Sequence, residues 1–147
     1  MSITELQADQ IRRECERLFL QIAWLTDHGP QREIAFLFCE DGEFDRDGAV
    51  FSGRAALLDL YAKRPANLMT RHLVSNIMVR PQSDVQAICH AYATVYRFRS
   101  ADGSASVPPV TCEGPENVTE YEDLMVKTGD GWKVSRRVMK AIIHIKN

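Results

Sequence analysis

The sequence lacks the features that direct a protein to a membrane, to nucleic acid or to export. No apolar stretch approaches the roughly 20 residues that a helix needs to cross a bilayer. Its 18 Lys and Arg against 20 Asp and Glu give a formal net charge of −2, which provides no electrostatic footprint for nucleic acid or for an anionic membrane. The first residues show no basic segment followed by an apolar run, so we expect no signal peptide and a cytoplasmic protein.

Short motifs for several common chemistries are also missing. There is no G-x-S-x-G, no phosphate-binding glycine loop and no H-E-x-x-H. The four cysteines, Cys15, Cys39, Cys89 and Cys112, form no C-x-x-C pair, and the four histidines are not at ligand spacing. Two disulfides are possible by count, but without an export signal we expect reduced, mostly buried thiols. We also expect neither a metal nor another cofactor.

The pattern that is present begins with an amphipathic helix. The composition, 45% hydrophobic and 26% charged over 147 residues, suits one globular domain over residues 1–147. Apolar residues recur at steps of four and three, which predicts one buried helical stripe: Ile11, Cys15, Leu18, Ile22 and Leu25. The helix should end near Asp27, because Gly29-Pro30 cannot continue it. A short helix after Pro30 and a third over residues 54–63 should follow.

Strands dominate the rest of the chain. Alternating patterns predict strands at residues 71–80, 85–99, 118–127 and 132–144, with a long loop at 101–117. Helices followed by a run of strands indicate an α+β fold. Three N-terminal helices packed into the hollow of a bent antiparallel sheet would leave a pocket at its open end.

Four blocks carry a resemblance to a known family. They are residues 23–27 (AWLTD), 34–44 (IAFLFCEDGEF), 51–57 (FSGRAAL) and 130–137 (DGWKVSRR). In order and spacing the chain resembles the SnoaL-like family of the nuclear-transport-factor-two-like superfamily. The resemblance implies a cone-shaped α+β fold, with three N-terminal helices packed in a strongly curved mixed or antiparallel sheet. It does not settle function, because this fold hosts enzymes, ligand binders and non-catalytic subunits.

The resemblance also implies a candidate catalytic pair. Scytalone dehydratase and hexachlorocyclohexane dehydrochlorinase use an Asp at the end of the first helix and a His on the first long strand. The matching positions here are Asp27 and His72. An imidazole oriented by a carboxylate can remove a carbon-bound proton near neutral pH. This implies a cofactor-free, dehydratase-like lyase or isomerase acting on a small apolar cyclic substrate. Alternatively, Asp27 lies in solvent and His72 lies in a subunit interface.

Five further residues are candidates for binding the substrate. They are Trp24, Asn76, Tyr92, Tyr96 and Met139. Simple alternation along residues 71–79 places His72, Val74, Asn76 and Met78 on one face, and Leu73, Ile77 and Val79 on the other. The two tyrosines share a strand face with His90, and a Tyr hydroxyl can polarise a carbonyl. Trp24, Met139 and the tyrosines also fit ordinary core positions. Arg136 and Arg137 point to opposite faces, so at most one of them enters the pocket.

A non-catalytic role is the competing interpretation. Residues 71–76, 95–99 and 132–139 resemble the small β subunit of aromatic-ring-hydroxylating dioxygenases, which mainly shapes an oligomer. A plain ligand-binding protein is a third interpretation. The lyase and the ligand-binding protein predict a small-molecule ligand, whereas a closed or solvent-filled cavity would favour the β-subunit-like role. All three interpretations predict a partner for the exposed sheet face, which we expect to be a second copy in a homodimer, with a trimer as the alternative.

Overall fold

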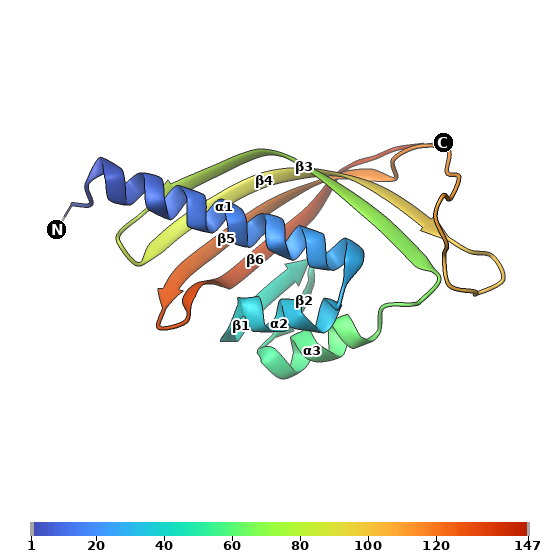
Figure 1. Cartoon of the computed structure of the whole chain (residues 1–147), viewed down its shortest axis with the longest axis horizontal. Helices are drawn as coiled ribbons and strands as arrows, with labels where there is room; N and C mark the ends of the chain where they lie inside the picture. The colour runs from blue at the N-terminus through green and yellow to red at the C-terminus, as the bar shows by residue number, and fades with distance from the viewer. Residues whose placement is uncertain (1, 147) are drawn as a thin grey trace.

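The computed structural model describes residues 2–146, in which helices come first and long strands follow. The helical segments are α1 (Glu5–His28), the 3-10 turn η1 (Gln31–Glu33), α2 (Ile34–Leu37) and α3 (Arg54–Ala62). The strands are β1 (Phe38–Arg46), β2 (Ala49–Ser52), β3 (Leu68–Pro81), β4 (Gln86–Arg99), β5 (Asn117–Thr128) and β6 (Gly131–His144). The chain therefore has the predicted α+β class, although the second helix gives way to β1 already at Phe38 (Figure 1).

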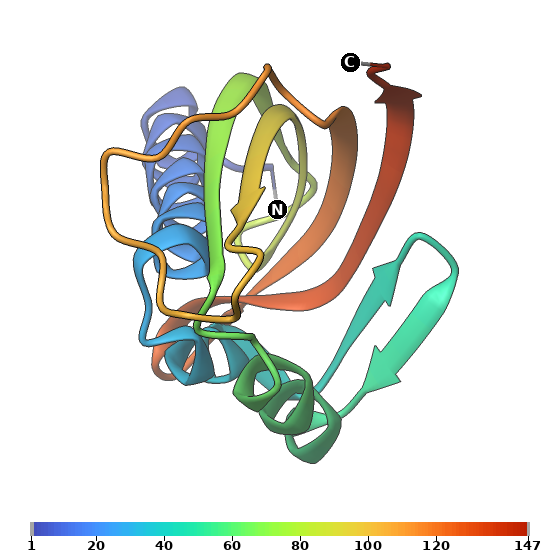
Figure 2. The same ribbon diagram turned by 90° about the vertical axis from the view of Figure 1, so that its right-hand side faces the viewer.

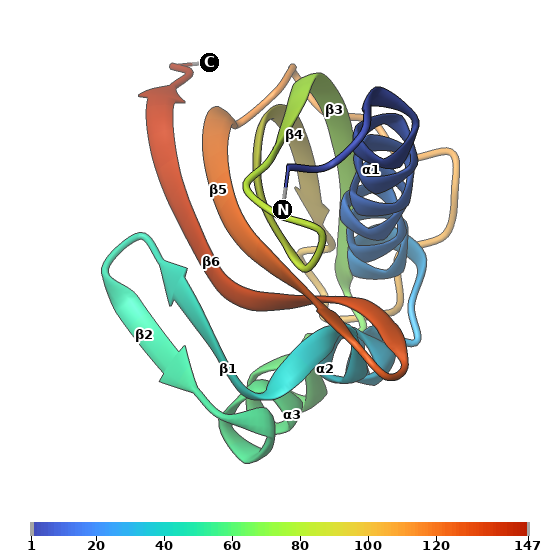
Figure 3. The same cartoon turned by 90° about the vertical axis from the view of Figure 1, so that its left-hand side faces the viewer.

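The six strands form one mixed sheet in the order β2-β1-β6-β5-β4-β3. All neighbours are antiparallel except β1 and β6, which run parallel. Figure 3 shows the long strands bending strongly, with α1 lying beside β3 inside the curve and the β1–β2 hairpin standing apart at the other edge. This is the expected curved sheet with three helices, and it leaves one end of the hollow without a helix.

Helix α1 buries the predicted stripe, and all five of its residues lie in the core. A capping box starts the helix: Thr4 Oγ1 accepts from the Gln7 backbone N–H, and Gln7 Oε1 accepts from the Thr4 backbone N–H. Gly29 ends it with φ 71°, a conformation that suits glycine, and its N–H donates to the Leu25 carbonyl. These two caps place Asp27 in the last turn, above β3.

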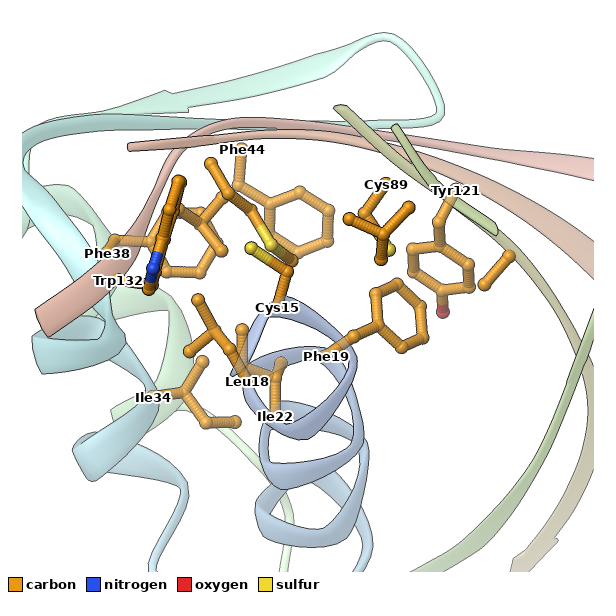
Figure 4. Close-up of a cluster of buried hydrophobic side chains, with 14 of the residues drawn as sticks. Cys15, Leu18, Phe19, Ile22, Ile34, Phe38, Phe44, Cys89, Tyr121 and Trp132 are labelled. Atoms are coloured by element: carbon orange, nitrogen blue, oxygen red, sulfur yellow. The ribbon is translucent and has the colours of Figure 1, made fainter. Parts of the chain in front are cut away.

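The inner face of β4 is made of small side chains, which lets α1 approach the sheet closely. Ala87, Cys89, Ala91, Ala93 and Val95 are all buried on this face. In Figure 4, Cys15 and Phe19 of α1 lie between Cys89 and Tyr121 on one side and Phe38 and Trp132 on the other. The Phe19 and Tyr121 rings meet edge to face with centroids 5.4 Å apart.

The four cysteines are free, as expected for a chain without an export signal. Cys15 and Cys89 are buried, Cys39 is half-buried and Cys112 is exposed. Burial raises the pKa of the Cys15 and Cys89 thiols to about 12, so both remain neutral core residues at ordinary pH.

A β-bulge in β3 overturns the simple alternation expected for residues 71–79. The register with β4 shifts between Ser75 and Met78, and Asn76 adopts φ 54°. One extra residue moves every following side chain to the opposite face. His72 and Val74, before the bulge, face inward as predicted.

After the bulge, the predicted assignment of side chains to the two faces of β3 was wrong. Ile77 packs against the core and Val79 is buried, whereas Asn76 and Met78 are exposed. Leu73, before the bulge, is exposed on the outer face as expected. The inner face of β3 therefore holds polar groups near the end of α1 and apolar groups farther along.

Candidate functional site

A cavity of about 700 Å³ occupies the end of the hollow that no helix fills. Its wall comes from the end of α1, from α3, and from all six strands, around the end of the sheet that faces the viewer in Figure 2. The loop at residues 100–116 crosses this end beside β3 and β4. The volume suits a small organic ligand.

Asp27 and His72 meet at this cavity. Asp27 Oδ1 lies 2.6 Å from His72 Nδ1, and Asp27 Oδ2 accepts from the His72 backbone N–H at 2.7 Å. The Asp27 side chain is 6% exposed and that of His72 is 13% exposed. The alternative in which Asp27 lies in solvent is therefore wrong, and His72 belongs to the cavity wall.

A chain of hydrogen bonds extends behind this pair. Thr70 Oγ1 donates to Asp27 Oδ1 at 2.8 Å, and Arg64 Nη2 donates to Thr70 Oγ1 at 2.7 Å. Burial disfavours a charged Asp27, but the hydrogen bonds and charge of His72, with the bond from Thr70, hold the pKa of the Asp27 carboxyl below its ordinary value. Asp27 is consequently ionised near neutral pH and acts only as an acceptor.

The state of Asp27 determines which nitrogen of His72 can act as a base. A carboxylate cannot donate, so the 2.6 Å contact requires the proton on His72 Nδ1. Nε2 then carries the lone pair in the neutral ring, and His72 lines the cavity. The arrangement can accept a proton at Nε2 and stabilise the resulting imidazolium through Asp27.

A second buried charge pair forms another part of the wall. Arg137 Nε and Nη2 donate to Asp123 Oδ1 and Oδ2 at 2.8 and 2.6 Å. The guanidinium lies 4.9 Å from the Phe19 ring centroid and 5.1 Å from that of Tyr121. Of the two neighbouring arginines, Arg137 thus enters the cavity, and Arg136 pairs with Glu43 on the exposed side.

Of the five residues predicted to bind substrate, only Met139 lines the cavity. Trp24 is 63% exposed on α1, where it stacks on His28 with ring centroids 3.8 Å apart. Asn76 is exposed at the β-bulge. The predicted placement of both in the pocket was wrong, because Trp24 lies off the buried stripe of α1 and the bulge turns Asn76 outward.

Tyr92 and Tyr96 were also placed on the wrong side. Both belong to the outer face of β4, where Tyr92 is 44% exposed and Tyr96 is half-buried. Both faces of β4 are rich in apolar residues, so alternation alone did not decide which one faces the helix. The alternation of small with large side chains was the available signal, since a packed helix needs the small ones.

Several wall residues escaped the sequence reasoning. Arg64, Thr70 and Tyr121 hold polar groups in or beside the cavity. Thr70 and Tyr121 are buried polar residues on strands, and Arg64 follows α3 in a segment that periodicity does not describe. Burial raises the pKa of Tyr121, so its hydroxyl remains protonated and can donate a hydrogen bond.

Residues 2–146 provide neither a metal-binding cluster nor a membrane-spanning helix. They contain no group of three or more His, Cys, Asp or Glu side chains placed to hold a metal ion. None of their helices is long and apolar enough to cross a membrane.

Comparisons with known proteins agree with this architecture. The family described as SnoaL-like domain matches residues 8–138. A search among curated proteins found no match.

Three solved structures illustrate the shared fold. A scytalone dehydratase-like protein from Novosphingobium aromaticivorans is 22% identical, covers 91% of this chain and 88% of its own, and has a TM-score of 0.74. ActVI-ORFA from Streptomyces coelicolor is 17% identical, with coverage of 90% and 98% and a TM-score of 0.71. A protein from Catenulispora acidiphila in complex with S-DNPA is 19% identical, with coverage of 90% and 94% and a TM-score of 0.67.

Proposed function

The chain belongs to the SnoaL-like domain family, and from that premise we propose that it is a lyase or isomerase in which His72 is the general base. Asp27 is its positioning residue. The substrate is a small, largely apolar cyclic molecule with an acidic carbon-bound proton beside a carbonyl. The observation that carries this proposal is the 2.6 Å contact between Asp27 and Nδ1 of His72 at the wall of a cavity.

The proposed reaction moves one proton and needs only side chains of this chain. Nε2 of His72 takes the proton from the carbon next to the carbonyl, and the electron pair of the broken C–H bond forms an enolate. In a dehydration, the electrons then expel a β-hydroxyl, which leaves as water with the proton from the imidazolium. In an isomerisation, the same proton returns to a different carbon. Asp27 stabilises the imidazolium in both cases.

Donors on β5 and β6 suit the developing enolate. Tyr121 and Arg137 both line the cavity, and the Tyr121 ring and the Arg137 guanidinium are held by packing against Phe19. Preorganised donors at the site of developing charge are among the largest contributions to enzymatic rate. We therefore place the carbonyl oxygen of the substrate toward these residues and its acidic carbon toward His72.

A ligand-binding protein without catalysis is the second candidate. One observation favours it: Asp27 also accepts from the His72 backbone N–H and the Thr70 hydroxyl, so the carboxylate would be needed simply to dock α1 on β3. In that case His72 would be a wall residue held by a structural clamp.

Deuterium incorporation from solvent separates the two candidates. A panel of cyclic ketones and β-hydroxy ketones is incubated with the protein in D₂O, and proton NMR follows exchange at the carbon next to the carbonyl. A lost general base typically costs about 10²–10⁴-fold in rate, so His72→Asn should lose exchange by at least the lower of these factors. Asp27→Asn should lose less and should shift the pH–rate profile.

The chain provides a matched control. His90 Nε2 lies 2.8 Å from Glu122 Oε2 on the outer face of the sheet, so it forms the same type of pair outside the cavity. His90→Asn should leave exchange unchanged. Exchange that survives in His72→Asn, or ligand binding without exchange for every ketone of the panel, would contradict the catalytic proposal and favour the binding protein.

A further inference from the structure

The cavity wall is positively charged although the chain as a whole is not. Among the described residues that line it, six are Lys or Arg and two are Asp or Glu, whereas the full sequence holds 18 and 20 of these. The wall therefore contains a third of the Lys and Arg residues of the chain but only a tenth of its Asp and Glu residues. The cations are Arg46, Lys63, Arg64, Arg97, Arg99 and Arg137.

Three of these cations already have carboxylate partners. Arg137 is bound by Asp123 behind the wall, and Lys63 pairs with Asp59 on the exposed side of α3. Arg97 Nε lies 2.7 Å from Glu116 Oε2, and this carboxylate is partly exposed at the rim of the cavity. Arg97 is therefore paired through Nε, and its two terminal nitrogens make no hydrogen bond within residues 2–146 and are free to donate to a ligand.

Arg64 lies next to Arg97 and close to the catalytic pair. Its guanidinium donates to Thr70 Oγ1, and Thr70 is the residue directly opposite Arg97 in the register of β3 with β4. Opposed side chains on one face of an antiparallel pair lie about 5 Å apart. Burial lowers the pKa of Arg64, and the positive charges of Arg97 and Arg46 lower it further, against the opposing effect of Asp27.

Arg46 completes the group from the other side of the cavity. It ends β1 at the rim of the cavity and is exposed. Among residues 2–146, neither Arg46 nor Arg64 has a carboxylate within direct salt-bridge distance. Like charges held together in a partly buried wall repel one another. An anion bound between them would replace this repulsion with attraction.

We infer that the substrate is an organic acid whose carboxylate binds to Arg64, Arg97 and Arg46, with its cyclic part extending toward His72. This inference rests on the proposed function and names its substrate class. A carboxylate has two oxygens that match the paired donors of a guanidinium. Thr70 and His72 are two residues apart on one strand face, a rise of about 7 Å, so a bound carboxylate and the base are separated by roughly the width of one ring.

A pair of probes that differ only in charge tests this inference. Isothermal titration calorimetry at low ionic strength compares 2-naphthoate with 2-naphthamide, which has the same ring system and no charge. A hydrogen bond to a charged group contributes about 1.5–3 kcal/mol, so the wild type should bind the acid at least about tenfold more tightly. The preference should fall to near unity in Arg64→Gln and Arg97→Gln.

Two variants test whether the lost preference for the acid arises from impaired folding in the variants or from the removal of any exposed arginine. Arg46 has no structural partner in the described chain, so Arg46→Gln should reduce the preference without affecting folding. Arg80 is an exposed arginine on the outer face of the same strand as Thr70, so Arg80→Gln should retain the full preference.

The outcomes also distinguish this inference from the proposed catalysis. His72→Asn should lose proton exchange and still prefer the acid. Equal affinity for acid and amide in the wild type, no binding of the acid at millimolar concentration, or a preference that Arg64→Gln, Arg97→Gln and Arg46→Gln all retain would overturn the inference.

Discussion

The carboxylate of Asp27 holds His72 at two points, the ring nitrogen Nδ1 at 2.6 Å and the main-chain nitrogen at 2.7 Å. The first contact determines the tautomer of the imidazole, and the second joins the last turn of α1 to β3. One side chain therefore links the packing of the first helix to the chemistry of the cavity. Its effects on stability and on the proposed catalysis can be measured separately.

Asp27→Asn should destabilise the protein in a pH-dependent way. At pH 7 we expect a loss of about 2–4 kcal/mol in the free energy of unfolding, because charged hydrogen bonds inside the protein are lost. The pKa of Asp27 is lowered in the folded state, so this stabilisation is present above the ordinary carboxyl pKa of about 3.9 and is lost as pH falls through the folded value.

Urea unfolding of wild type and Asp27→Asn between pH 3 and pH 7 checks this expectation. The difference between the two proteins should narrow toward acid pH. The exposed Asp9 on α1, which pairs with Arg12 at the surface, provides the control, and Asp9→Asn should follow the wild type. A difference in unfolding free energy that stays constant from pH 3 to pH 7 would contradict the assignment of this stabilisation to ionised Asp27.

Breaking the buried Arg137–Asp123 pair on one side should be severely destabilising. Asp123→Ala leaves an uncompensated guanidinium in the wall and should cost about 3–5 kcal/mol. The double variant Asp123→Leu, Arg137→Met removes both charges and should recover most of that loss.

Chemical denaturation of both variants measures the effect. The exposed pair of Arg136 and Glu43 is the comparison, and Arg136→Ala should cost less than about 1 kcal/mol. Equal losses for Asp123→Ala and the double variant would show that the charge is not the cause.

Asn76 should respond to backbone conformation and not to ligand. Its φ of 54° is tolerated by Asn and Gly, but for a β-branched residue it costs roughly 1–2 kcal/mol. Thermal unfolding should therefore rank Asn76→Val well below Asn76→Gly, which should stay close to wild type. Neither variant should alter 2-naphthoate binding. A loss of affinity for 2-naphthoate in Asn76→Gly would contradict this expectation and support the original prediction that Asn76 binds the substrate.

The outer face of the sheet exposes apolar side chains, and we expect a second copy of the chain to bind there. Leu73 and Met78 of β3 and Tyr92 of β4 are exposed there on neighbouring strands. We expect a homodimer at micromolar concentration in sedimentation velocity, and dissociation in Leu73→Glu because a buried unpaired charge is unfavourable. Leu6→Glu, at an exposed leucine of α1, should remain dimeric. A wild-type monomer would contradict the expectation.

Elements governed by local periodicity were predictable from the sequence. The buried stripe of α1 follows from spacing alone, and Gly29-Pro30 locates the end of the helix within two residues. The pairing of Asp27 with His72 came from a family resemblance, since nothing in local spacing relates residues 45 positions apart. The α+β class followed from the separation of helices and strands.

The errors on β3 and β4 have one physical origin, which is the alternation of side chains between the two faces of a strand, whereas Trp24 was misplaced on helix α1. A single residue in the left-handed region, Asn76, reverses inside and outside for the rest of β3, and no pattern of hydrophobicity marks it. On β4, both faces are covered or apolar, so Tyr92 could be assigned to either. The positive charge of the cavity wall could not be predicted from the sequence. Arg46, Arg64 and Arg97 come from three separate segments that only the tertiary fold brings together.

The position of β6 in the sheet also has a consequence for biosynthesis. This strand lies between β1 and β5 and follows both in the sequence, so the ribosome releases the two flanking strands before the one that joins them. Until residues 131–144 emerge, β1 and β5 each present an unpaired edge, and the wall lacks Arg137 and Met139. Chaperone contact and aggregation during synthesis should therefore be concentrated in this interval, and ligand should begin to bind only after it.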